Sequence, residues 1–273
     1  MITEGSGGAF DIDNSAGRAK LGPKAMSAAP AISVVVACKN PGPRLAAALG
    51  SVWEQTGSAS ELVVIDGASV DGTREWLAAR ADRLTAWISE SDGGVYAAMN
   101  TGARLARGDW LLFLGADDCL AGPGVLATVA ARLATEDAGV GVGEAAYDDG
   151  RVYRLAGRPR PAARNFAHHQ ATFYRRDCFA GGGYDESLRA QADYDFNLRL
   201  WRAGVRFRAL PVRVALCASG GLSDGGRWAN YREEITVRHR HFPGWRCWPW
   251  DAGSVVRYLR KAIVRSRARH RPE

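Results

Sequence analysis

The sequence has no hydrophobic run long enough to cross a membrane. No apolar stretch approaches the ~20 residues that a spanning helix needs. The N-terminus opens Met1-Ile-Thr-Glu and has neither the basic flank nor the apolar segment of a signal peptide, so we expect a cytoplasmic protein. Hydrophobic residues make up 47% of the chain and charged residues 24%, which is the composition of a globular domain with a sizeable core.

Cysteine is scarce and follows no pairing pattern. The five cysteines are Cys38, Cys119, Cys178, Cys217 and Cys247. They are odd in number, scattered along the chain and never arranged as CxxC. The pattern therefore argues against a disulfide framework and against a zinc site, and it suits a reducing compartment.

Most of the chain carries no excess of basic charge, because the excess gathers near the C-terminus. The 36 Lys and Arg residues outnumber the 29 Asp and Glu residues by seven. Seven basic residues with no acid among them account for that difference: Arg257, Arg260, Lys261, Arg265, Arg267, Arg269 and Arg271. A nucleic-acid-binding protein would carry its basic residues on a folded face, so we expect no nucleic-acid partner.

Strand and helix patterns alternate in the part of the chain after residue 30. The stretch 32–37 is a continuous β-branched run, as expected for a parallel strand that is buried on both faces. Four strand–helix alternations predict an open, mostly parallel, twisted α/β sheet flanked by helices. The expected strands are 32–37, 61–65, 86–89 and 110–114, and the expected helices are 44–55, one opened by Asp71 as N-cap, and 95–106.

The second half and the two ends of the chain are less regular. Residues 1–30 are rich in Gly, Ala and Ser without hydrophobic periodicity and predict a disordered leader. We expect one α/β domain over 31–226 and a C-terminal helical region over 227–273. Weaker patterns predict strands near Val140, Thr172 and Val205, and a helix over 193–203 with Phe196, Leu200 and Trp201 on its core-facing side.

Acidic turns follow two of the expected strands. Asp66 ends the second strand, and Asp117 and Asp118 follow the fourth. Ligands bind beyond the carboxyl ends of parallel strands, so these turns would face one crevice. Carboxylate oxygens suit Mg²⁺ or Mn²⁺, which keep open positions for phosphate oxygens. Taken alone, Asp117 and Asp118 are better explained as turn or N-cap residues before the next helix, and the other motifs reverse that preference.

Three further segments place polar residues beside an expected element. The glycine-rich stretch that begins at Asp92 precedes a helix, where backbone amides approach an anion closely, although a simple helix cap explains it equally well. His169 and Gln170 stand just before a strand, where a lone histidine is more often structural. Asp193 begins an amphipathic helix and suits an N-cap, a catalytic group or both.

Five segments occur in an order that resembles a known family. They are DGxSxDGT from Asp66, DxGxYxAxNxG from Asp92, FLGADD from Phe113, HQAxFYRR from His169 and ADYDFNLRL from Ala192. From about residue 32 to the Gly220-Gly-Leu-Ser segment, the chain resembles the family 2 inverting glycosyltransferases of GT-A fold. Within that family it most resembles small non-processive members that build bacterial envelope polysaccharides and glycolipids. It lacks the QxxRW motif of processive synthases.

The resemblance implies a GT-A catalytic domain that moves one sugar from a nucleotide-diphosphate sugar to a hydroxyl of a glycan or glycolipid acceptor. Asp118 would coordinate Mg²⁺ or Mn²⁺, Asp117 would share the metal or touch the donor ribose, and Asp193 would be the general base. His169 and Gln170 would lie near the acceptor or the diphosphate. The nucleotide pocket would be lined by Ala37, Lys39, Asp66, Asp92 and Asn100.

Two positions depart from the family pattern and leave the donor base open among uridine, guanosine and thymidine. Gly67 stands where many relatives carry a second Asp, and Gly115 occupies the first position of the longer DxDD form. Other classes fit less well. A sugar-nucleotide pyrophosphorylase or a dinucleotide-dependent oxidoreductase would carry GxGTRL or GxGxxG where ACKNPGP follows the first strand. A non-catalytic sugar-nucleotide-binding module stays an alternative, opposed by the retention of both acidic sites.

The last helical pattern is basic and amphipathic. On a helical wheel Val255, Val256, Tyr258, Leu259, Ala262 and Ile263 share one face, and Arg257, Arg260, Lys261 and Arg265 share the other. Trp245, Trp248 and Trp250 stand just upstream, and tryptophan favours membrane interfaces. The pattern predicts a helix that lies on an anionic membrane surface, at the inner face of the plasma membrane. The alternative is a helix packed on the catalytic body with a frayed basic end.

Overall fold

The fold was obtained as a computed structural model. The structure describes residues 31–155, 160–220 and 227–269, and only the backbone of 264–269. The expected leader, most of the Gly220-Gly-Leu-Ser segment and the end of the basic tail lie outside this part of the chain.

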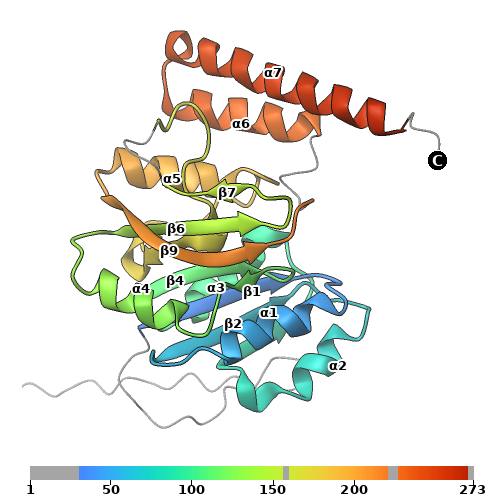
Figure 1. The fold of residues 1–273 in the computed structure, drawn as a ribbon, viewed down its shortest axis with the longest axis vertical. Helices are drawn as coiled ribbons and strands as arrows, with labels where there is room; N and C mark the ends of the chain where they lie inside the picture. Colours follow the sequence, from blue (N-terminus) through green and yellow to red (C-terminus); the bar gives the residue numbers. More distant parts are fainter. Residues whose placement is uncertain (1–30, 156–159, 221–226, 270–273) are drawn as a thin grey trace, which may run out of the picture.

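A twisted sheet forms the centre of the described chain (Figure 1). Its strand order is β3-β2-β1-β4-β8-β6-β9-β5, and β7 pairs with β6. The strands β1, β2, β3, β4, β6 and β9 run in one direction, and β5, β7 and β8 run in the other. The sheet is therefore mostly parallel, which confirms the expected α/β class. The strands are β1 Ile32–Cys38, β2 Ser60–Asp66, β3 Ala86–Ser89, β4 Trp110–Gly115, β5 Cys119–Leu120, β6 Val140–Tyr147, β7 Val152–Tyr153, β8 Thr172–Arg175 and β9 Phe207–Cys217.

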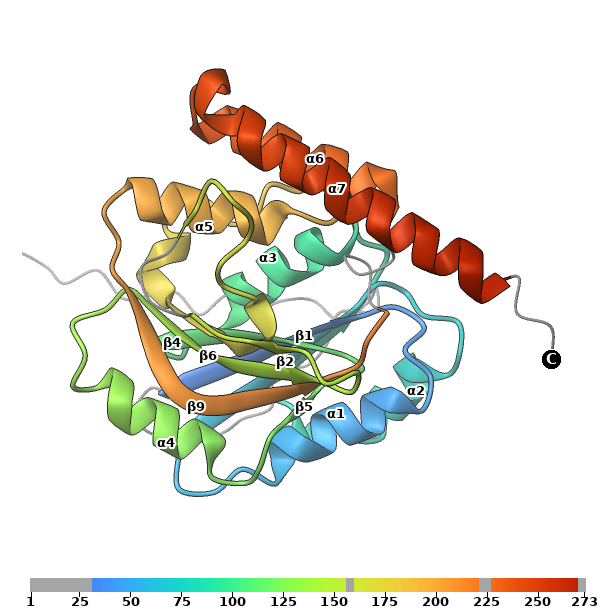
Figure 2. The same ribbon diagram turned by 45° about the horizontal axis from the view of Figure 1, so that its top comes forward.

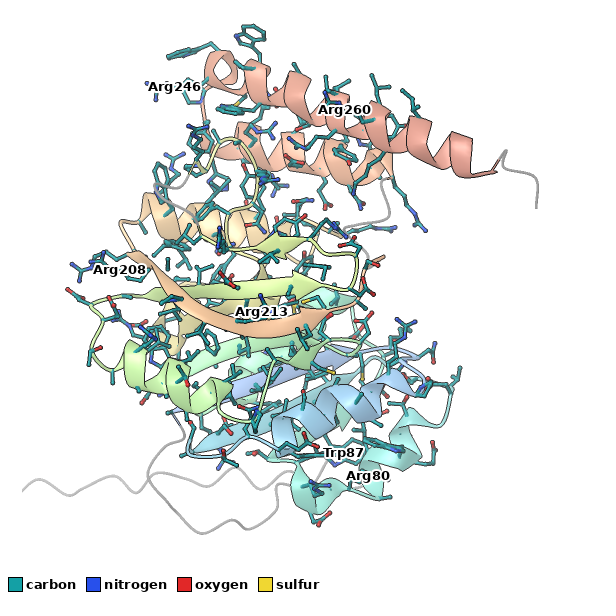
Figure 3. The ribbon with its side chains drawn as sticks, in the orientation of Figure 1. Arg80, Trp87, Arg208, Arg213, Arg246 and Arg260 are labelled. Carbon is teal, nitrogen blue, oxygen red and sulfur yellow. The ribbon has the colours of Figure 1, made fainter. Side chains whose placement is uncertain are left out.

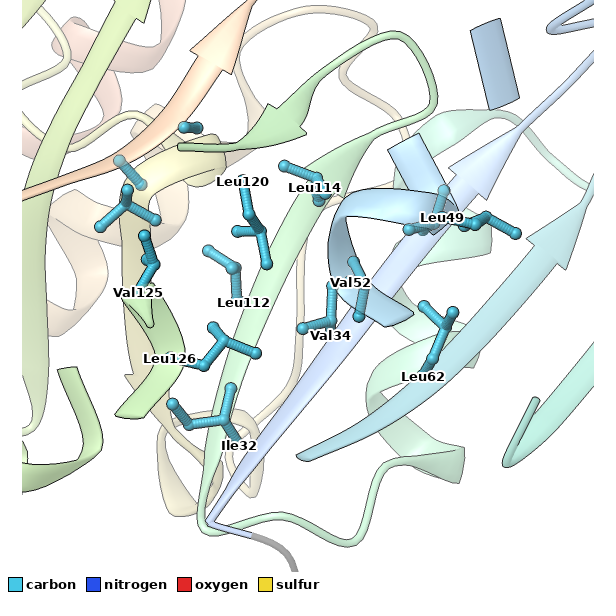
Figure 4. Close-up of a cluster of buried hydrophobic side chains, with 14 of the residues drawn as sticks. Ile32, Val34, Leu49, Val52, Leu62, Leu112, Leu114, Leu120, Val125 and Leu126 are labelled. Atoms are coloured by element: carbon cyan, nitrogen blue, oxygen red, sulfur yellow. The ribbon is translucent and has the colours of Figure 1, made fainter. Parts of the chain in front are cut away.

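Helices cover both faces of the sheet (Figure 2). The helices α1, α2 and α4 pack on one face, and α3 and α5 pack on the other. Alternate residues of β1 divide between the two cores, since Val34 faces the first set and Val35 faces the second. Figure 4 shows the first core, where Leu49 and Val52 lie over the strands. The helices are α1 Arg44–Trp53, α2 Thr73–Ala78, α3 Val95–Leu105, α4 Val125–Leu133 and α5 Ala192–Arg202.

Two predicted details of the helix starts were wrong. The N-cap of α2 is Gly72, and the Asp71 carboxylate instead accepts hydrogen bonds from the backbone amide and hydroxyl of Thr73 (3.2 and 2.6 Å). The N-cap of α5 is Gln191, so Asp193 lies inside the first helical turn. In both helices the acidic side chain is displaced by one or two positions from the cap that the sequence pattern indicates.

The second half of the chain also differs from its weak pattern in two places. The strand expected near Val205 begins at Phe207. Trp201 was expected on the core side of α5 but is 40% exposed, and its ring contacts Phe242. The first two turns of α5 are buried on every side, from Ala192 to Leu198. Phe196 therefore packs in the core, whereas Trp201 near the end of the helix does not.

A helix pair lies beyond α5, on the side away from α1 and α2 (Figures 1 and 2). It consists of α6 Trp228–His241 and α7 Gly244–Arg269, which pack side by side. Figure 3 shows Arg246 and Arg260 on α7, at the end of the molecule opposite Arg80 and Trp87. The three tryptophans that we expected upstream of the last helix lie within α7. Within the described ranges, no helix combines the length and apolar character needed to span a membrane.

Candidate active site

The carboxyl ends of the parallel strands bring three of the expected residues to one edge of the sheet. Ala37 of β1 pairs with Gly115 of β4, and the next residue of β1 pairs with Asp66 at the end of β2. Lys39 follows β1 directly and is exposed. The register therefore places the predicted nucleotide-binding positions 37, 39 and 66 next to the turn that carries Asp117 and Asp118.

Asp66 is fully buried, and hydroxyl groups satisfy its carboxylate. The Ser89 hydroxyl donates to it over 2.6 Å, and both the hydroxyl and the backbone amide of Ser69 donate to it as well. The Ser69 hydroxyl oxygen in turn accepts a hydrogen bond from the Asn40 amide (2.6 Å). Asp66 thus ties the turn after β2 to the ends of β1 and β3, and its predicted contact with the nucleotide stays a prediction.

The absence of a side chain at Gly67 leaves room for the Asp92 carboxylate. A Cβ atom at Gly67 would lie 2.8 Å from Oδ2 of Asp92, so a side chain there would have to displace this carboxylate. Asp92 also accepts a hydrogen bond from the Gly94 amide (3.0 Å) at the start of α3. Asp92, which follows β3, therefore fills the space that a side chain at position 67 would take.

Asn100 lies apart from this edge. Its side-chain amide donates to the Tyr184 carbonyl (2.9 Å) and to Glu186 (2.8 Å), and its oxygen accepts from the Tyr184 amide (2.8 Å). It lines a separate cavity together with Trp110, which is at the opposite end of β4 from Gly115. Asn100 therefore holds the 184–186 segment on α3, and the structure does not bring it together with the other predicted nucleotide residues.

Asp117 and Asp118 form an acidic pair at the end of β4. Asp117 is partly exposed and contacts Arg44 (3.4 Å), whereas Asp118 is buried and accepts a hydrogen bond from the Ala218 amide (3.0 Å). A Cβ atom at Gly115 would collide with the Asp118 carboxylate and approach that of Asp117. Glycine at this position therefore leaves open the space that both carboxylates border.

The electrostatics of this pair fit a divalent cation. Burial, and then the negative charge of Asp117, raise the pKa of Asp118. A cation between the two carboxylates would remove that repulsion. Among the described residues, no group of three or more His, Cys, Asp and Glu side chains could hold a metal ion. The two aspartates suit a metal that takes its remaining ligands from phosphate oxygens and water.

A second polar cluster surrounds Asp193 in the first turn of α5. Its carboxylate accepts hydrogen bonds from the Asn165 amide (2.8 Å) and, more loosely, from the Tyr96 hydroxyl (3.4 Å). His169 Nδ1 lies 3.4 Å from the same carboxylate. Burial, followed by the charge of Asp193, raises the pKa of Tyr96 far above its ordinary value, so Tyr96 stays protonated as a donor. The carboxylate is only 9% exposed and is held in one orientation from several sides.

His169 contacts Asp193 and belongs to the same polar cluster. Among the described residues, the buried side-chain oxygen of the neighbouring Gln170 has no hydrogen-bond partner. Buried polar atoms are nearly always paired, so an unpaired oxygen beside this cluster fits a ligand-facing position.

Comparison with known proteins places the chain among enzymes of one reaction class. A family model described as Glycosyl transferase family 2 matches residues 33–185, which is more than half of the chain. The chain belongs to glycosyl transferase family 2. The PGL/p-HBAD biosynthesis glycosyltransferase of Mycobacterium bovis (strain BCG / Pasteur 1173P2) is 38% identical over 183 residues, covering 63% of this chain and 70% of that protein. An uncharacterized glycosyltransferase of Mycobacterium tuberculosis (strain ATCC 25618 / H37Rv) is 32% identical over 206 residues, covering 70% and 76%. The protein is therefore a glycosyltransferase.

Solved structures confirm the GT-A-like fold of this glycosyltransferase. S. aureus TarS 1–349 in complex with UDP-GlcNAc superposes with a TM-score of 0.61 at 17% identity, covering 76% of this chain and 65% of that chain. A mannosyltransferase from Pyrobaculum calidifontis in complex with GDP-Man and Mn²⁺ superposes with a TM-score of 0.59 at 19% identity, covering 88% and 80%. At these identities the likeness is one of fold.

Sequence reasoning missed two residues of the glycosyltransferase's Asp193 cluster. Tyr96 lies within the DxGxYxAxNxG segment, so its position carried a signal, but the pattern does not say which side chain it meets. Asn165 lies outside every recognised segment and had no signal at all. It contacts Asp193 because the Asn197 amide, one turn further along α5, holds the Asn165 oxygen (3.0 Å).

Asp195, a second carboxylate in the first turns of α5, is already engaged in the structure. Arg199 lies 3.0 Å from one oxygen and His241 Nε2 lies 2.8 Å from the other, so Asp195 joins α5 to α6. This leaves Asp193 as the carboxylate of the α5 start that faces Tyr96, Asn165 and His169.

Proposed function

We propose that this glycosyltransferase moves a single sugar, with inversion, from a nucleotide-diphosphate sugar to a hydroxyl of a lipid-linked glycan or glycolipid of the bacterial envelope. One observation carries the proposal. The Asp193 carboxylate is oriented by Asn165 and Tyr96 and contacted by His169, and it is separate from the acidic pair at the end of β4. One acidic group thus stands where an acceptor proton would be taken, and a separate pair stands where a diphosphate would leave.

Asp193 supplies the base for a direct displacement. As the acceptor oxygen attacks the anomeric carbon, its proton passes to an oxygen of Asp193, and the bond from the sugar to the nucleoside diphosphate breaks on the opposite side. A positioned carboxylate in this role contributes about 10²–10⁴-fold to the rate. The hydrogen bonds from Asn165 and Tyr96 keep the carboxylate in place, and no covalent sugar–enzyme bond is required.

Asp117 and Asp118 would hold Mg²⁺ or Mn²⁺. The bound cation would act as a Lewis acid and stabilise the charge that develops on the departing diphosphate. Asp118 is fixed by the Ala218 amide, while the more exposed Asp117 can also meet the donor ribose. Two fold neighbours were solved with ligands, UDP-GlcNAc in one case and GDP-Man with Mn²⁺ in the other, and these complexes support a nucleotide-sugar donor and a divalent metal.

The acceptor class is inferred from the relatives and from α7. The Mycobacterium bovis relative is named for PGL/p-HBAD biosynthesis. Along α7 an apolar stripe faces solvent, formed by Trp245, Trp248, Val255, Val256, Leu259 and Ile263. Exposed stripes of this kind, with basic neighbours, favour the surface of an anionic membrane. We therefore place the enzyme peripherally on the inner face of the plasma membrane, where a lipid-linked acceptor would be presented.

A donor screen tests the reaction class. The full-length enzyme is incubated with Mn²⁺ and a panel of UDP-, GDP- and dTDP-sugars, with and without a membrane lipid extract, and released nucleoside diphosphate and free sugar are measured. We expect release of nucleoside diphosphate from one donor, faster with the extract. Release of no diphosphate from any donor would favour a non-catalytic binding module. Formation of nucleoside triphosphate and sugar 1-phosphate in a parallel incubation with added pyrophosphate would favour a pyrophosphorylase.

A further inference from the structure

A cavity of about 760 Å³ opens beside the Asp193 cluster. Strands β6 and β7 form one wall, and the segment 160–168 forms another. Trp250 of α7 also lines it, so the helix that carries the exposed apolar stripe forms part of the cavity wall. The volume is that of a site for a small-molecule ligand.

The charge on the cavity wall is positive. Arg154, Arg160 and Arg164 line it, and none of the described residues that line it is Asp or Glu. Arg154 contacts Glu144 at 3.5 Å in a largely exposed pair, a weak interaction in water. Within the described residues no carboxylate forms a salt bridge with Arg160 or Arg164. Burial lowers the pKa of the lining His168 to about 4, so His168 is neutral at pH 7 and the arginines carry the charge.

The cavity wall reaches the proposed general base. Asn165 lines the cavity and donates its hydrogen bond to Asp193. Side chains of α5 and α6 hold the backbone just before Asn165. The Tyr194 hydroxyl donates to the Pro161 carbonyl (2.6 Å), and buried Arg238 donates to the Ala162 carbonyl (2.6 Å). A ligand in the cavity would therefore sit against a preformed wall next to Asp193.

Arg238 joins this wall to the helix pair. It is fully buried in α6 and pairs with Glu234 (2.8 Å) and with Asp251 of α7. Its guanidinium thus connects α6, α7 and the segment that holds Asn165. Trp250 is one residue before Asp251, so the same ion pairs hold it against the cavity. The helix pair therefore forms part of the cavity wall.

The apolar part of the wall lies beside the arginines. Tyr153, Leu155 and Phe166 line the cavity together with Trp250. The Phe166 ring packs against Phe207, and the Tyr153 ring packs on His168 at 4.1 Å between centroids, so two of these rings are held by neighbours. Aromatic and aliphatic side chains with guanidinium groups bind a molecule that has an apolar part and an anionic part.

We propose that this cavity is the acceptor subsite, and that it takes an acceptor whose anionic group, a phosphate or carboxylate, is joined to an apolar stem. The arginines bind the anion, and the stem packs against Trp250 and the other apolar side chains of the cavity wall. Calling the ligand an acceptor rests on the proposed function. Binding of such a molecule is measurable without any transfer reaction.

Binding of three probes by calorimetry tests the proposal on the full-length protein. Octyl phosphate has the anion and the stem, octyl glucoside has the stem alone, and inorganic phosphate has the anion alone, all below micellar concentrations. We expect octyl phosphate to bind at least about tenfold more tightly than either of the others, since charge-assisted hydrogen bonds and apolar burial act together. Equal binding of inorganic phosphate would indicate a free-anion site, and equal binding of octyl glucoside would remove the role of the arginines. Either result overturns the proposal.

Matched variants locate the binding. Arg160→Gln with Arg164→Gln should weaken octyl phosphate about tenfold or more, while Arg74→Gln with Arg132→Gln, which removes the same charge from α2 and α4, should not. Trp250→Ala should weaken octyl phosphate more than inorganic phosphate. Unchanged binding by the cavity variants would contradict the proposal. Nucleotide binding with Mn²⁺ is measured on the same samples, so failure of the donor site and failure of this cavity give different results.

Discussion

At the scale of single residues, the two acidic clusters differ in how the protein holds them. The Asp193 carboxylate receives hydrogen bonds from Tyr96 and Asn165, and His169 Nδ1 lies 3.4 Å from it, so its direction is fixed. Asp118 is buried beside a second carboxylate, and its pKa is raised as a result. The first arrangement suits a base that must stay in place, and the second suits a site that gains from binding a cation.

Replacing Asp193 with asparagine tests the base. Asp193→Asn keeps the size and most hydrogen bonds of the side chain but cannot accept the acceptor's proton, so we expect turnover to fall by at least about 100-fold. Nucleotide affinity should change little. Steady-state transfer rates and calorimetric nucleotide binding provide the two measurements, with Asp177→Asn, an exposed carboxylate of a surface pair, as the control. A variant that transfers sugar at the wild-type rate would assign the base to another residue.

Replacing Asp118 with asparagine tests the metal. The pKa of Asp118 is raised in the folded protein, so ionisation of this group above its ordinary pKa of 3.8 lowers the free energy of unfolding. Asp118→Asn should therefore not lower the melting temperature in the absence of metal. The Mn²⁺ concentration for half-maximal turnover should rise at least about tenfold, since one of two carboxylate ligands is lost. Thermal melts and Mn²⁺ titrations of donor turnover check both. Full wild-type activity in excess EDTA would contradict the assignment.

At the scale of elements, α5 is the part of the chain on which both the base and the helix pair depend. Its first turns are buried even though they contain two aspartates. One aspartate faces the cluster with Tyr96 and Asn165, and the other, Asp195, pairs with Arg199 and with His241 of α6. One face of the helix thus carries the proposed base, and another face carries the contact with α6.

The Asp195 pair predicts a pH-dependent stability. Burial raises the pKa of Asp195, but the hydrogen bonds from His241 and Arg199 outweigh burial, and the net pKa lies below the ordinary 3.8. The stabilisation is therefore complete above about pH 4 and is lost as the pH falls through the folded-state pKa. We expect Asp195→Asn to lower the free energy of unfolding by about 1–3 kcal/mol at pH 7 and by less at pH 3.5. Urea denaturation of both proteins at pH 7, 5 and 3.5 measures this, and a difference that grows with acidity would be inconsistent with it.

At the scale of the whole molecule, the helix pair turns an apolar surface outward. The side of α7 that packs on α6 is polar, with Ser254 fully buried and Arg257 paired with Glu234 at 2.6 Å. The Tyr258 ring packs on Trp228 and Tyr231 of α6, so this side also takes a residue that the helical wheel grouped with the apolar face. The expected division into an apolar and a basic face was therefore wrong for Tyr258, while Arg257 of the expected basic face packs on α6.

Substitution of the outward stripe tests membrane docking. Val256→Asn, Leu259→Asn and Ile263→Asn together leave the α6-facing side intact, whereas truncation before Gly253 would break the Arg257–Glu234 pair. We expect co-sedimentation with anionic liposomes to fall at least about tenfold, because three half-exposed apolar side chains are lost from the interface. Val70→Asn with Val152→Asn, exposed valines elsewhere, is the matched control. Equal binding by both variants, or binding without preference for anionic lipid at moderate salt, would reject the membrane proposal.

The local pattern was enough to predict the sheet and the acidic turns. A continuous β-branched run such as 32–37 has no polar face to expose, so it can only be a strand covered on both sides, and β1 is buried accordingly. The carboxyl ends of parallel strands meet at one edge, which follows from topology alone. Asp66, Asp117 and Asp118 were therefore predictable as neighbours in an open α/β sheet. The GT-A class was implied by the resemblance of five segments to a known family.

Contacts between distant segments required the tertiary structure. Tyr96 and Asn165 are 97 and 28 residues away from Asp193 in the chain, and they meet it because α3, α5 and the segment before β8 pack together. The same applies to Asn100, which matched the family pattern but is held by residues 184–186. The amphipathic pattern of α7 was visible in the sequence, but the buried Arg238 network decides which side of the helix faces α6. Periodicity describes one element at a time, whereas the direction a side chain takes depends on what packs against that element.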